Sequence, residues 1–299
     1  MLYRQIEQNK RKTVILVLLF VGLVLAVGAA FGYVYQANWQ SGLFTALVIS
    51  AIYVPFTYLT ANAQVLSMAG AKAVTAEEYP VLYNIVEGLC IPAQIPMPKI
   101  YVVHDPAPNA FATGLSPKKG AVAFTTGLLD RLNREELEAV AAHEIGHIRN
   151  YDIRLMTISI ALVGIIALLA DIGTRMLIFR SGGRGDRKNQ HPAIMIIGIV
   201  LIILAPLVAQ FVHFAVSRNR EYLADATAVE LTRNASGMIG ALRKISGSDE
   251  NLTVRSAKQA TASMYIASPF NKDRHSSSFM SWFATHPSIP SRIERLEKM

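Results

Sequence analysis

The chain has 299 residues, of which 52% are apolar, and its mean hydropathy is positive. Its net charge of +8 could suit nucleic acid, but the basic residues flank apolar segments and no recognisable binding module is present, so we expect no nucleic-acid partner. The single cysteine, Cys90, excludes an intrachain disulfide and a cysteine-based zinc site, so any metal must be held by His and carboxylates. Residues 13–71 contain no charged side chain, which predicts contact with a lipid bilayer.

Two long apolar runs occupy the amino-terminal part of the chain, at about 13–35 and 42–61. Each can span about 30 Å of hydrocarbon as a helix of about 20 residues. Small residues at 27–30 resemble a signal-peptide cleavage site, but the first run continues past them and the second follows at once, which favours a signal anchor. Because basic residues precede the first run and the link is uncharged, we expect a cytoplasmic amino terminus and a membrane hairpin over residues 1–71.

Residues 72–154 have the pattern of the first part of a soluble domain. Thr75 and Glu78 predict a capping box in front of a helix over residues 79–90. Three short stretches rich in β-branched and aromatic residues, separated by Pro and Gly, predict a small antiparallel sheet. They lie at 99–104, 108–114 and 120–126.

A second capping box, Asn133 with Glu136, starts a helix that carries the sequence HEIGH from His143 to His147. Four residues advance a helix by about 6 Å and rotate it about 40° beyond a full turn, so both imidazoles face one side and can share a metal. Glu144 stands between them, where such a site places its general base. The spacing therefore predicts a zinc site and not two structural histidines.

Two further apolar segments follow at about 155–177 and 193–216, joined by a basic loop. The first is short for a full span and runs into Asp171 and Arg175, which lie one turn apart and are expected to pair near the membrane surface. If the residues before and after this hairpin, 155–217, share a metal, its loop must be external, which contradicts the positive-inside rule. Either zinc assembly overrides the charge bias or the hairpin does not fully span, and the sequence leaves both open.

Residues 218–299 form the second part of the soluble domain, beginning with a helix that carries the sequence EYLAD. Zinc needs a third protein ligand, and Glu221 is a candidate because Asp225 follows one turn later, where it can accept the second N–H of a ligating imidazole. From the residues alone, both could equally be solvated surface acids. His213, two turns before Glu221, is interpreted as a polar residue that a neighbouring helix satisfies.

Three motifs, in this order and among these apolar segments, resemble the HtpX family of heat-shock-linked membrane proteases, which are relatives of the CAAX prenyl proteases. They are HEIGH at 143–147, EYLAD at 221–225 and THPSIPSR at 285–292. The resemblance extends over essentially the whole chain. It implies a mainly α-helical fold, with multi-span membrane helices and a cytoplasmic zincin-like α+β catalytic domain that carries the small antiparallel sheet.

The resemblance also implies the chemistry of the site. One zinc ion is expected on His143, His147 and Glu221, with catalysis by Glu144 and support from Asp225. His286 resembles the residue that donates to the developing oxyanion in related metalloproteases, although a His-Pro pair can also be an ordinary turn before a helix. Arg292 is expected to orient the local structure.

The stretch with Asn109, Ala110 and Phe111 resembles the edge strand that lies over the metal in such proteases. An extended peptide could add to that edge by main-chain hydrogen bonds. Because Pro-Asn and Thr-Gly pairs are common at strand ends, the stretch could equally be an ordinary strand and turn.

Together these features predict a zinc endopeptidase of the cell (plasma) membrane with its active site facing the cytoplasm. Its expected substrates are proteins, misfolded membrane proteins among them, and its expected role is quality control or stress response. One rival is an enzyme with a narrow task, such as processing one prenylated or signalling peptide. A second rival is a catalytically silent membrane scaffold or transporter with structural zinc, against which Glu144 argues because a structural site does not need it.

Overall fold

The computed structural model of the chain describes residues 2–162, 218–247, 254, 264–267 and 287–299. Most of the second apolar pair, with Asp171, Arg175 and His213, lies outside these residues. The described part is mainly helical and carries one small sheet.

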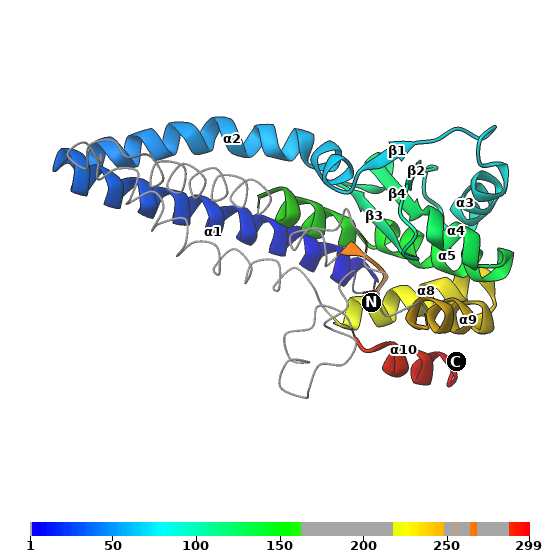
Figure 1. Ribbon diagram of the computed structural model, residues 1–299. Coiled ribbons are helices and arrows are strands. Elements are labelled where there is room, and N and C mark those ends of the chain that lie inside the picture. The colour runs from blue at the N-terminus through cyan, green and yellow to red at the C-terminus, as the bar shows by residue number, and fades with distance from the viewer. Residues whose placement is uncertain (1, 163–217, 248–253, 255–263, 268–286) are drawn as a thin grey trace, which may run out of the picture.

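Helices α1 (Leu2–Gln36) and α2 (Trp39–Met68) form a long hairpin that projects from the rest of the molecule (Figure 1). Both are long and apolar enough to cross a membrane, over Glu7–Ala30 and Trp39–Met68. Their large apolar side chains are widely exposed, as lipid contact requires: Leu18 is 64% exposed and Leu59 is 75% exposed. The two amino-terminal runs that the sequence predicts are therefore present as helices, and both extend beyond the predicted limits.

The hairpin helices approach each other closely at three glycines. A Cβ atom on Gly28 would lie 2.7 Å from the carbonyl oxygen of Gly42, and one on Gly32 would lie 2.7 Å from the Gly42 nitrogen. Any larger residue would push the two backbones apart. Glycines four residues apart on one helix are a common way for membrane helices to pack this closely.

The sheet is mixed, with the strand order β1 (Ala71–Ala73), β2 (Lys99–Val103), β4 (Gly120–Thr125) and β3 (Ala110–Gly114). The prediction of a purely antiparallel sheet is wrong, because β2 and β4 are parallel. β1, which the sequence did not suggest, pairs antiparallel with β2.

The reason for the parallel pair lies in the connection after β2. Pro106 and Pro108 interrupt this connection, and prolines lack the N–H that a direct hairpin partner would need. The chain instead forms β3 at the outer edge first. It then returns through a short 3-10 turn, Pro117–Lys119, so that β4 fits between β3 and β2 and runs in the direction of β2.

Helix α3 (Pro80–Ala93) occupies the place predicted for the first helix of this unit, but its start differs. Only half of the predicted capping box forms: Thr75 N–H donates to Glu78 Oε2 over 2.8 Å, and the segment there is a turn. The helix begins at Pro80, since proline is favoured in a first helical turn and disfavours helical backbone in the residue before it.

Helix α5 (Arg134–Arg149) lies at the centre of the soluble part (Figure 1). It follows the short helix α4 (Thr126–Arg131), packs on β3 and β4, and is covered on other sides by α3, α8 (Arg218–Thr232) and α9 (Ala235–Ser246). Helix α10 (Ile289–Leu296) packs on α8 and α9. A side chain on α5 therefore has neighbours from both halves of the sequence.

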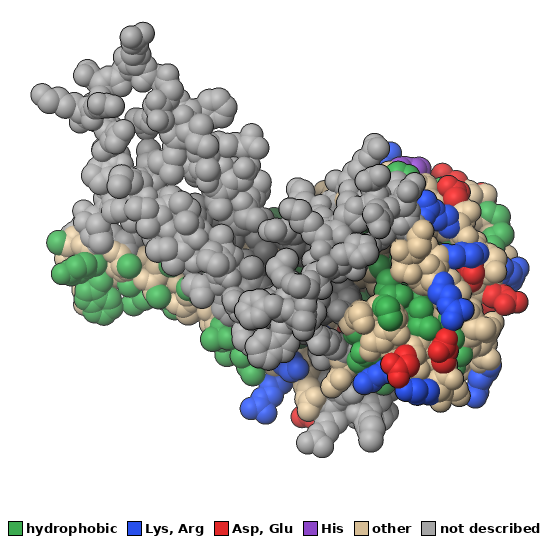
Figure 2. Space-filling model, turned by 60° about the horizontal axis from the view of Figure 1, so that its bottom comes forward, with side chains coloured by type: hydrophobic (Ala, Val, Ile, Leu, Met, Phe, Trp, Pro, Cys, Tyr) green, Lys and Arg blue, Asp and Glu red, His purple; other side chains and the backbone are tan. Residues whose placement is uncertain are grey.

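The α1–α2 hairpin is joined to the part that carries the sheet by the helical residues 152–162, which pack against α1 and α2. Leu16 and Phe20 of α1, Ala61 of α2, and Leu155 and Ile158 belong to one buried apolar cluster. Figure 2 shows the contrast between the two parts: hydrophobic side chains gather on the visible hairpin, whereas charged side chains are spread over the soluble part.

Candidate metal centre

Helix α5 supplies three of the residues that the motif predicts for the site. The capping box at its start is confirmed: Glu136 N–H donates to Asn133 Oδ1 over 2.9 Å, and Asn133 N–H donates to Glu136 Oε2 over 2.8 Å. Further along the helix, His143 and His147 lie on one face with their Nε2 atoms 3.2 Å apart. Glu144 lies between them and is only 1% exposed.

Helix α8 brings Glu221 to the two imidazoles. Its Oε1 atom lies 3.6 Å from His147 Nε2, and its Oε2 atom lies 3.9 Å from His143 Nε2. The two helices can approach this closely because α5 carries Gly146 at the contact. A Cβ there would already lie 3.3 Å from the side chain of Thr227 on α8.

The three side chains fit a zinc ion. The ligand atoms of His143, His147 and Glu221 all lie within 4.8 Å of one another. In a tetrahedral site with zinc bonds of about 2.0–2.1 Å, two ligand atoms lie about 3.3–3.5 Å apart, close to the separations given above. Two imidazole nitrogens and one carboxylate form a donor set typical of catalytic zinc, which keeps a fourth position open.

Each imidazole also contacts a carboxylate through its other nitrogen. His143 Nδ1 lies 2.9 Å from Asp225 Oδ1, and His147 Nδ1 lies 3.2 Å from Asp152 Oδ2. Such a contact fixes the ring orientation and leaves Nε2 free to accept a metal. The structure thus places Asp225 where the sequence analysis expected it.

Asp152 is a site residue that the sequence motifs do not indicate. Tyr151 has the left-handed backbone angle φ of 59°, which ends the path of α5 and starts the helix of residues 152–162 in a new direction. Positive φ is uncommon for a bulky residue, so the pattern around Tyr151 gave no signal for this bend. Asp152 follows His147 by five residues, a spacing that suggests contact with His147 only if the chain bends between them.

Arg292, on α10, reaches the site through Asp225. Its Nε donates to Asp225 Oδ2 over 2.9 Å and its Nη2 donates to Asp225 Oδ1 over 2.6 Å, a two-point contact that is buried. Its Nη1 donates to the carbonyl oxygen of Ile266 over 2.9 Å. The carboxylate that contacts His143 is therefore itself held in place by the carboxyl-terminal helix.

Comparison with known proteins assigns the family. Residues 76–299 match peptidase family M48. The chain belongs to this family. Over the full length of both chains it is 51% identical to the Protease HtpX homolog of Listeria monocytogenes serotype 4a (strain HCC23), and 47% identical to the homologs of Ligilactobacillus salivarius (strain UCC118) and Streptococcus uberis (strain ATCC BAA-854 / 0140J). The crystal structure of S. mikatae Ste24p is 18% identical with a TM-score of 0.46, covering 99% of this chain and 67% of that chain.

The resemblance to the HtpX family that the motifs indicate is thus confirmed. M48 is a family of metalloproteases, and the chain carries two helices that could cross a membrane. These findings identify a membrane protease with a candidate metal centre at His143, His147 and Glu221.

Burial and neighbouring charges set the protonation of the M48 site. Burial lowers the pKa of His143 to about 4. Burial would also lower the pKa of His147, but the hydrogen bond with Asp152 and the charge of Glu221 outweigh it and raise this pKa to about 9. Burial raises the pKa of Glu144 to about 7, so that the group can accept and release a proton near neutral pH.

Asp225 stays ionised despite its burial. Burial would raise the pKa of its carboxyl group, but the charge of Arg292 and the contact with His143 lower it to about 2. Four carboxylates, those of Glu144, Asp152, Glu221 and Asp225, and two arginines, Arg220 and Arg292, share a small volume around the candidate metal centre.

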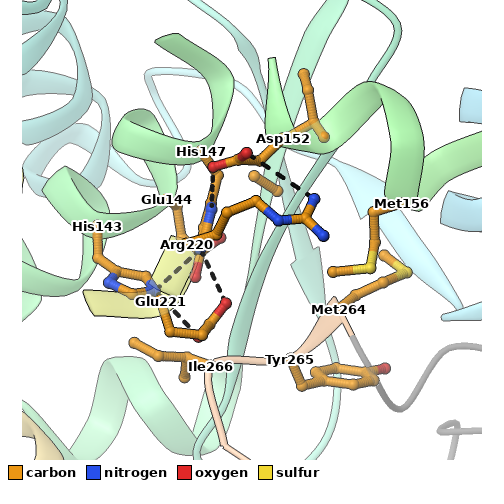
Figure 3. Close-up of a pocket in the computed structure, with 12 residues that line it drawn as sticks. His143, Glu144, His147, Asp152, Met156, Arg220, Glu221, Met264, Tyr265 and Ile266 are labelled. Carbon is orange, nitrogen blue, oxygen red and sulfur yellow. Dashed lines mark hydrogen bonds and ion pairs between the residues drawn. The ribbon is translucent and has the colours of Figure 1, made fainter. Parts of the chain in front are cut away.

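A pocket opens beside the ligands, as Figure 3 shows. Met156, Met264 and Tyr265 give it an apolar wall, and Arg220 projects into it from α8. The sequence analysis missed Arg220, because an arginine next to an acid on an amphipathic helix is most often a solvated surface residue.

The stretch predicted to bind substrate, Asn109 to Phe111, lies at the edge of the sheet, but part of that edge is paired with the chain itself. Ile266 N–H donates to the carbonyl oxygen of Ala110 over 3.0 Å, and Asn109 Nδ2 donates to the carbonyl oxygen of Ala267 over 3.0 Å. The ring of Phe111 packs edge-on against Tyr265, with ring centroids 5.3 Å apart. Residues 264–267 thus lie along the strand nearest the metal centre.

His286, the expected oxyanion donor, lies outside the described residues.

Proposed function

We propose that this M48 chain is a zinc-dependent endopeptidase of the cell membrane that cleaves membrane or cytoplasmic-face proteins, misfolded ones among them, in quality control or stress response. We also propose that its active site faces the cytoplasm. The observation that supports the activity best is the set of zinc-like separations among His143, His147 and Glu221, with the buried Glu144 beside them. Zinc held by these three residues would polarise the scissile carbonyl and activate a water molecule near neutral pH.

Glu144 is proposed as the general base. The N–H of Ala112 on β3 donates to its carboxylate, while its Oε2 atom has no hydrogen-bond partner in the described part of the chain. That oxygen is available to take a proton from the attacking water and to deliver it to the leaving amine. A pKa near 7 suits both transfers.

The carboxylates behind the imidazoles are proposed to hold the ligands in position. Asp225 and Asp152 each contact the nitrogen that faces away from the metal site, which favours the tautomer able to ligate through Nε2. Arg292 is proposed to keep Asp225 ionised and oriented.

A substrate peptide is proposed to bind in an extended form along the edge of β3, at Asn109, Ala110 and Phe111. The contacts of residues 264–267 support this idea, because they show that this edge can accept a backbone N–H at Ala110 and can hold a peptide group through the Asn109 side chain. A substrate that bound in the same way would take their place. Contacts to the main chain would give broad specificity.

His286 is proposed to donate to the scissile carbonyl oxygen as that oxygen gains negative charge. This role rests on the THPSIPSR motif alone.

The activity is tested with the purified full-length chain, loaded with zinc and supplied with unfolded casein as substrate. We expect about one zinc per chain by elemental analysis, cleavage of casein at internal bonds, and loss of cleavage after chelation with return on adding zinc. If the chain binds one zinc ion but cleaves neither casein nor any membrane protein offered to it, the result would favour a catalytically silent membrane scaffold or transporter with structural zinc.

A further inference from the structure

The two Nη atoms of Arg220 lie at the pocket of the candidate metal centre without a hydrogen-bond partner among the described residues. Arg220 directly precedes Glu221 on α8, is 9% exposed, and extends its guanidinium group into the pocket (Figure 3). Neither Nη1 nor Nη2 has a hydrogen-bond partner in the part of the chain that the structure describes.

The nearest acid does not satisfy this guanidinium group. Arg220 Nη1 lies 3.9 Å from Asp152 Oδ1, too far for a hydrogen bond. Both oxygens of Asp152 already have partners: Oδ1 accepts from Asn9 Nδ2 over 2.6 Å, and Oδ2 contacts His147. Asp152 therefore offsets the charge of Arg220, but within the described residues it leaves the donors on both Nη atoms without an acceptor.

A buried guanidinium group with free donors is costly. Desolvating a charged group without compensating hydrogen bonds destabilises a protein by several kcal/mol. If charge neutralisation were the sole role of Arg220, a hydrogen-bonded pair with Asp152 or Glu221 would be the more stable arrangement. The two Nη atoms are instead buried at the pocket beside the metal ligands, with no protein acceptor among the described residues.

The pocket favours a neutral oxygen acceptor over an anionic one. Glu144, Asp152 and Glu221 all line it and can offset the charges of Arg220 and of the proposed zinc ion, so a neutral acceptor adds no charge that needs a partner. Ala112, Ile153 and Met156, which lie outside residues 264–267, give the pocket an apolar side that suits the body of a peptide. A carbonyl oxygen of a peptide bond can accept from both Nη atoms without adding charge.

We propose that Arg220 binds a main-chain carbonyl oxygen of the substrate close to the scissile bond and so fixes how deeply the peptide enters the pocket. This role rests on the proposed peptidase function. It adds a substrate contact from α8, within the pocket beside the metal ligands.

The test measures binding and does not depend on turnover. Full-length, zinc-loaded chain with Glu144→Gln is titrated into fluorescein-labelled unfolded casein, and the Kd is read from fluorescence anisotropy. Adding Arg220→Met, which keeps an unbranched apolar stem and removes the donors, should weaken binding by about tenfold or more, because hydrogen bonds from a charged donor are lost. Zinc content should stay that of the parent, and the melting temperature should not fall below it. The matched control is Arg243→Met, which removes an exposed arginine on α9 and should leave the Kd unchanged.

A second variant, Arg220→Lys, separates donor geometry from charge. It keeps the positive charge but loses the planar fork, so we expect zinc content like that of the parent and a Kd that remains several-fold weaker. Full recovery of binding with Lys would overturn the proposal, since charge alone would then suffice. Unchanged casein binding by Arg220→Met, or loss of zinc as its main effect, would also overturn it and assign Arg220 to neutralising Asp152 and Glu221.

The kind of oxygen is tested with two labelled peptides of one sequence, one of which has Asn and Gln in place of every Asp and Glu. Arg220→Met should weaken both by the same factor. Weakening confined to the acidic peptide would overturn the main-chain assignment in favour of a carboxylate site. Casein cleavage by the wild-type chain, measured alongside, tests the proposed function separately, because cleavage can be present or absent whatever Arg220 binds.

Discussion

Asn9, in the first turns of α1, donates a hydrogen bond of 2.6 Å from its Nδ2 atom to Oδ1 of Asp152. The same Nδ2 atom lies 3.3 Å from the carbonyl oxygen of Asn150, and both Asn9 and Asp152 are buried. Since Asp152 contacts His147, the first helix of the α1–α2 hairpin supports the orientation of a candidate metal ligand across more than 140 residues of sequence.

This contact predicts that Asn9→Ala weakens zinc binding. Removing a residue that hydrogen-bonds to a metal ligand typically lowers metal affinity about 10–100-fold. Asn9 contacts His147 only through Asp152, so we expect zinc affinity to fall about tenfold. The measurement is competition for zinc against a chromophoric chelator. The control is Gln8→Ala, which changes the exposed neighbour on α1. Equal affinity for Asn9→Ala and the wild type would show that α1 only packs against the site.

Replacing Glu144 should remove activity alone, whereas replacing Glu221 should remove both zinc binding and activity. Glu144→Gln should abolish casein hydrolysis while zinc stays near one per chain, because Gln cannot accept the proton. Elemental analysis and a cleavage assay on the same sample measure both. Glu135→Gln, an exposed acid at the start of α5, serves as control. Zinc loss from Glu144→Gln would reassign that residue as a ligand.

Glu221→Ala should lose both zinc and activity, since a carboxylate ligand is removed. We expect its zinc affinity to fall by at least about 100-fold, measured by chelator competition. Glu230→Gln, on the same helix and exposed at its side chain, is the control. A Glu221→Ala chain that retains its zinc would contradict the proposed ligand set.

Zinc affinity should rise with pH up to about 9. Metal-free His147 has a pKa of about 9 and is protonated below it, whereas a ligating imidazole must be neutral. Each ligation event at pH 7 to 9 therefore releases about one proton, and affinity should increase about tenfold per pH unit in that range. Asp152→Asn removes the charge that raises this pKa, so its affinity should stop rising at lower pH. An affinity that is flat between pH 7 and 9 in the wild type would argue against a protonated His147.

The contact of residues 264–267 with β3 predicts reversible inhibition by a disulfide. Asn109→Cys with Ala267→Cys, in a Cys90→Ser background, should cross-link under oxidation, because Asn109 and Ala267 already form hydrogen bonds. The cross-linked chain should lose casein binding, and a phosphine reductant should restore it to the level of the unoxidised double variant. Equal binding in both states would show that substrate does not take the place of residues 264–267.

Topology is predicted from the charge-free link between α1 and α2. A single cysteine at position 41 should react with an impermeant thiol reagent from outside cells, and one at position 288 should not. Both are introduced in a Cys90→Ser background, although native Cys90 is buried and burial raises its pKa to about 11. Equal labelling at the two positions would contradict a cytoplasmic active site.

The sequence predicts best what depends on neighbours along the chain. The capping box of Asn133 and Glu136 and the shared face of His143 and His147 follow from helical periodicity, which local residues determine. The start of α3 also follows from a local residue, Pro80, whose preference for the first helical turn prevails over the capping box that Thr75 and Glu78 predict.

What the sequence could not predict depends on contacts between distant segments. The parallel pairing of β2 with β4 results from the detour through β3, and the place of Asp152 results from the bend at Tyr151. Arg220 has an ordinary sequence context and becomes notable only through its burial in the pocket. The pairing of Ile266 with Ala110 joins residues 156 positions apart, for which no periodic signal exists.

The cover that residues 264–267 form over β3 also has a consequence for association between copies of the chain. An uncovered strand edge presents free N–H and C=O groups that invite pairing with any extended segment of a second molecule, and this is a common start of aggregation. At Ala110 the chain satisfies its own edge. If a substrate displaces residues 264–267 during cleavage, the substrate itself covers the edge. Residues 264–267 cover the edge again when they return. Intermolecular pairing would then be limited to the short interval between product release and the return of these residues.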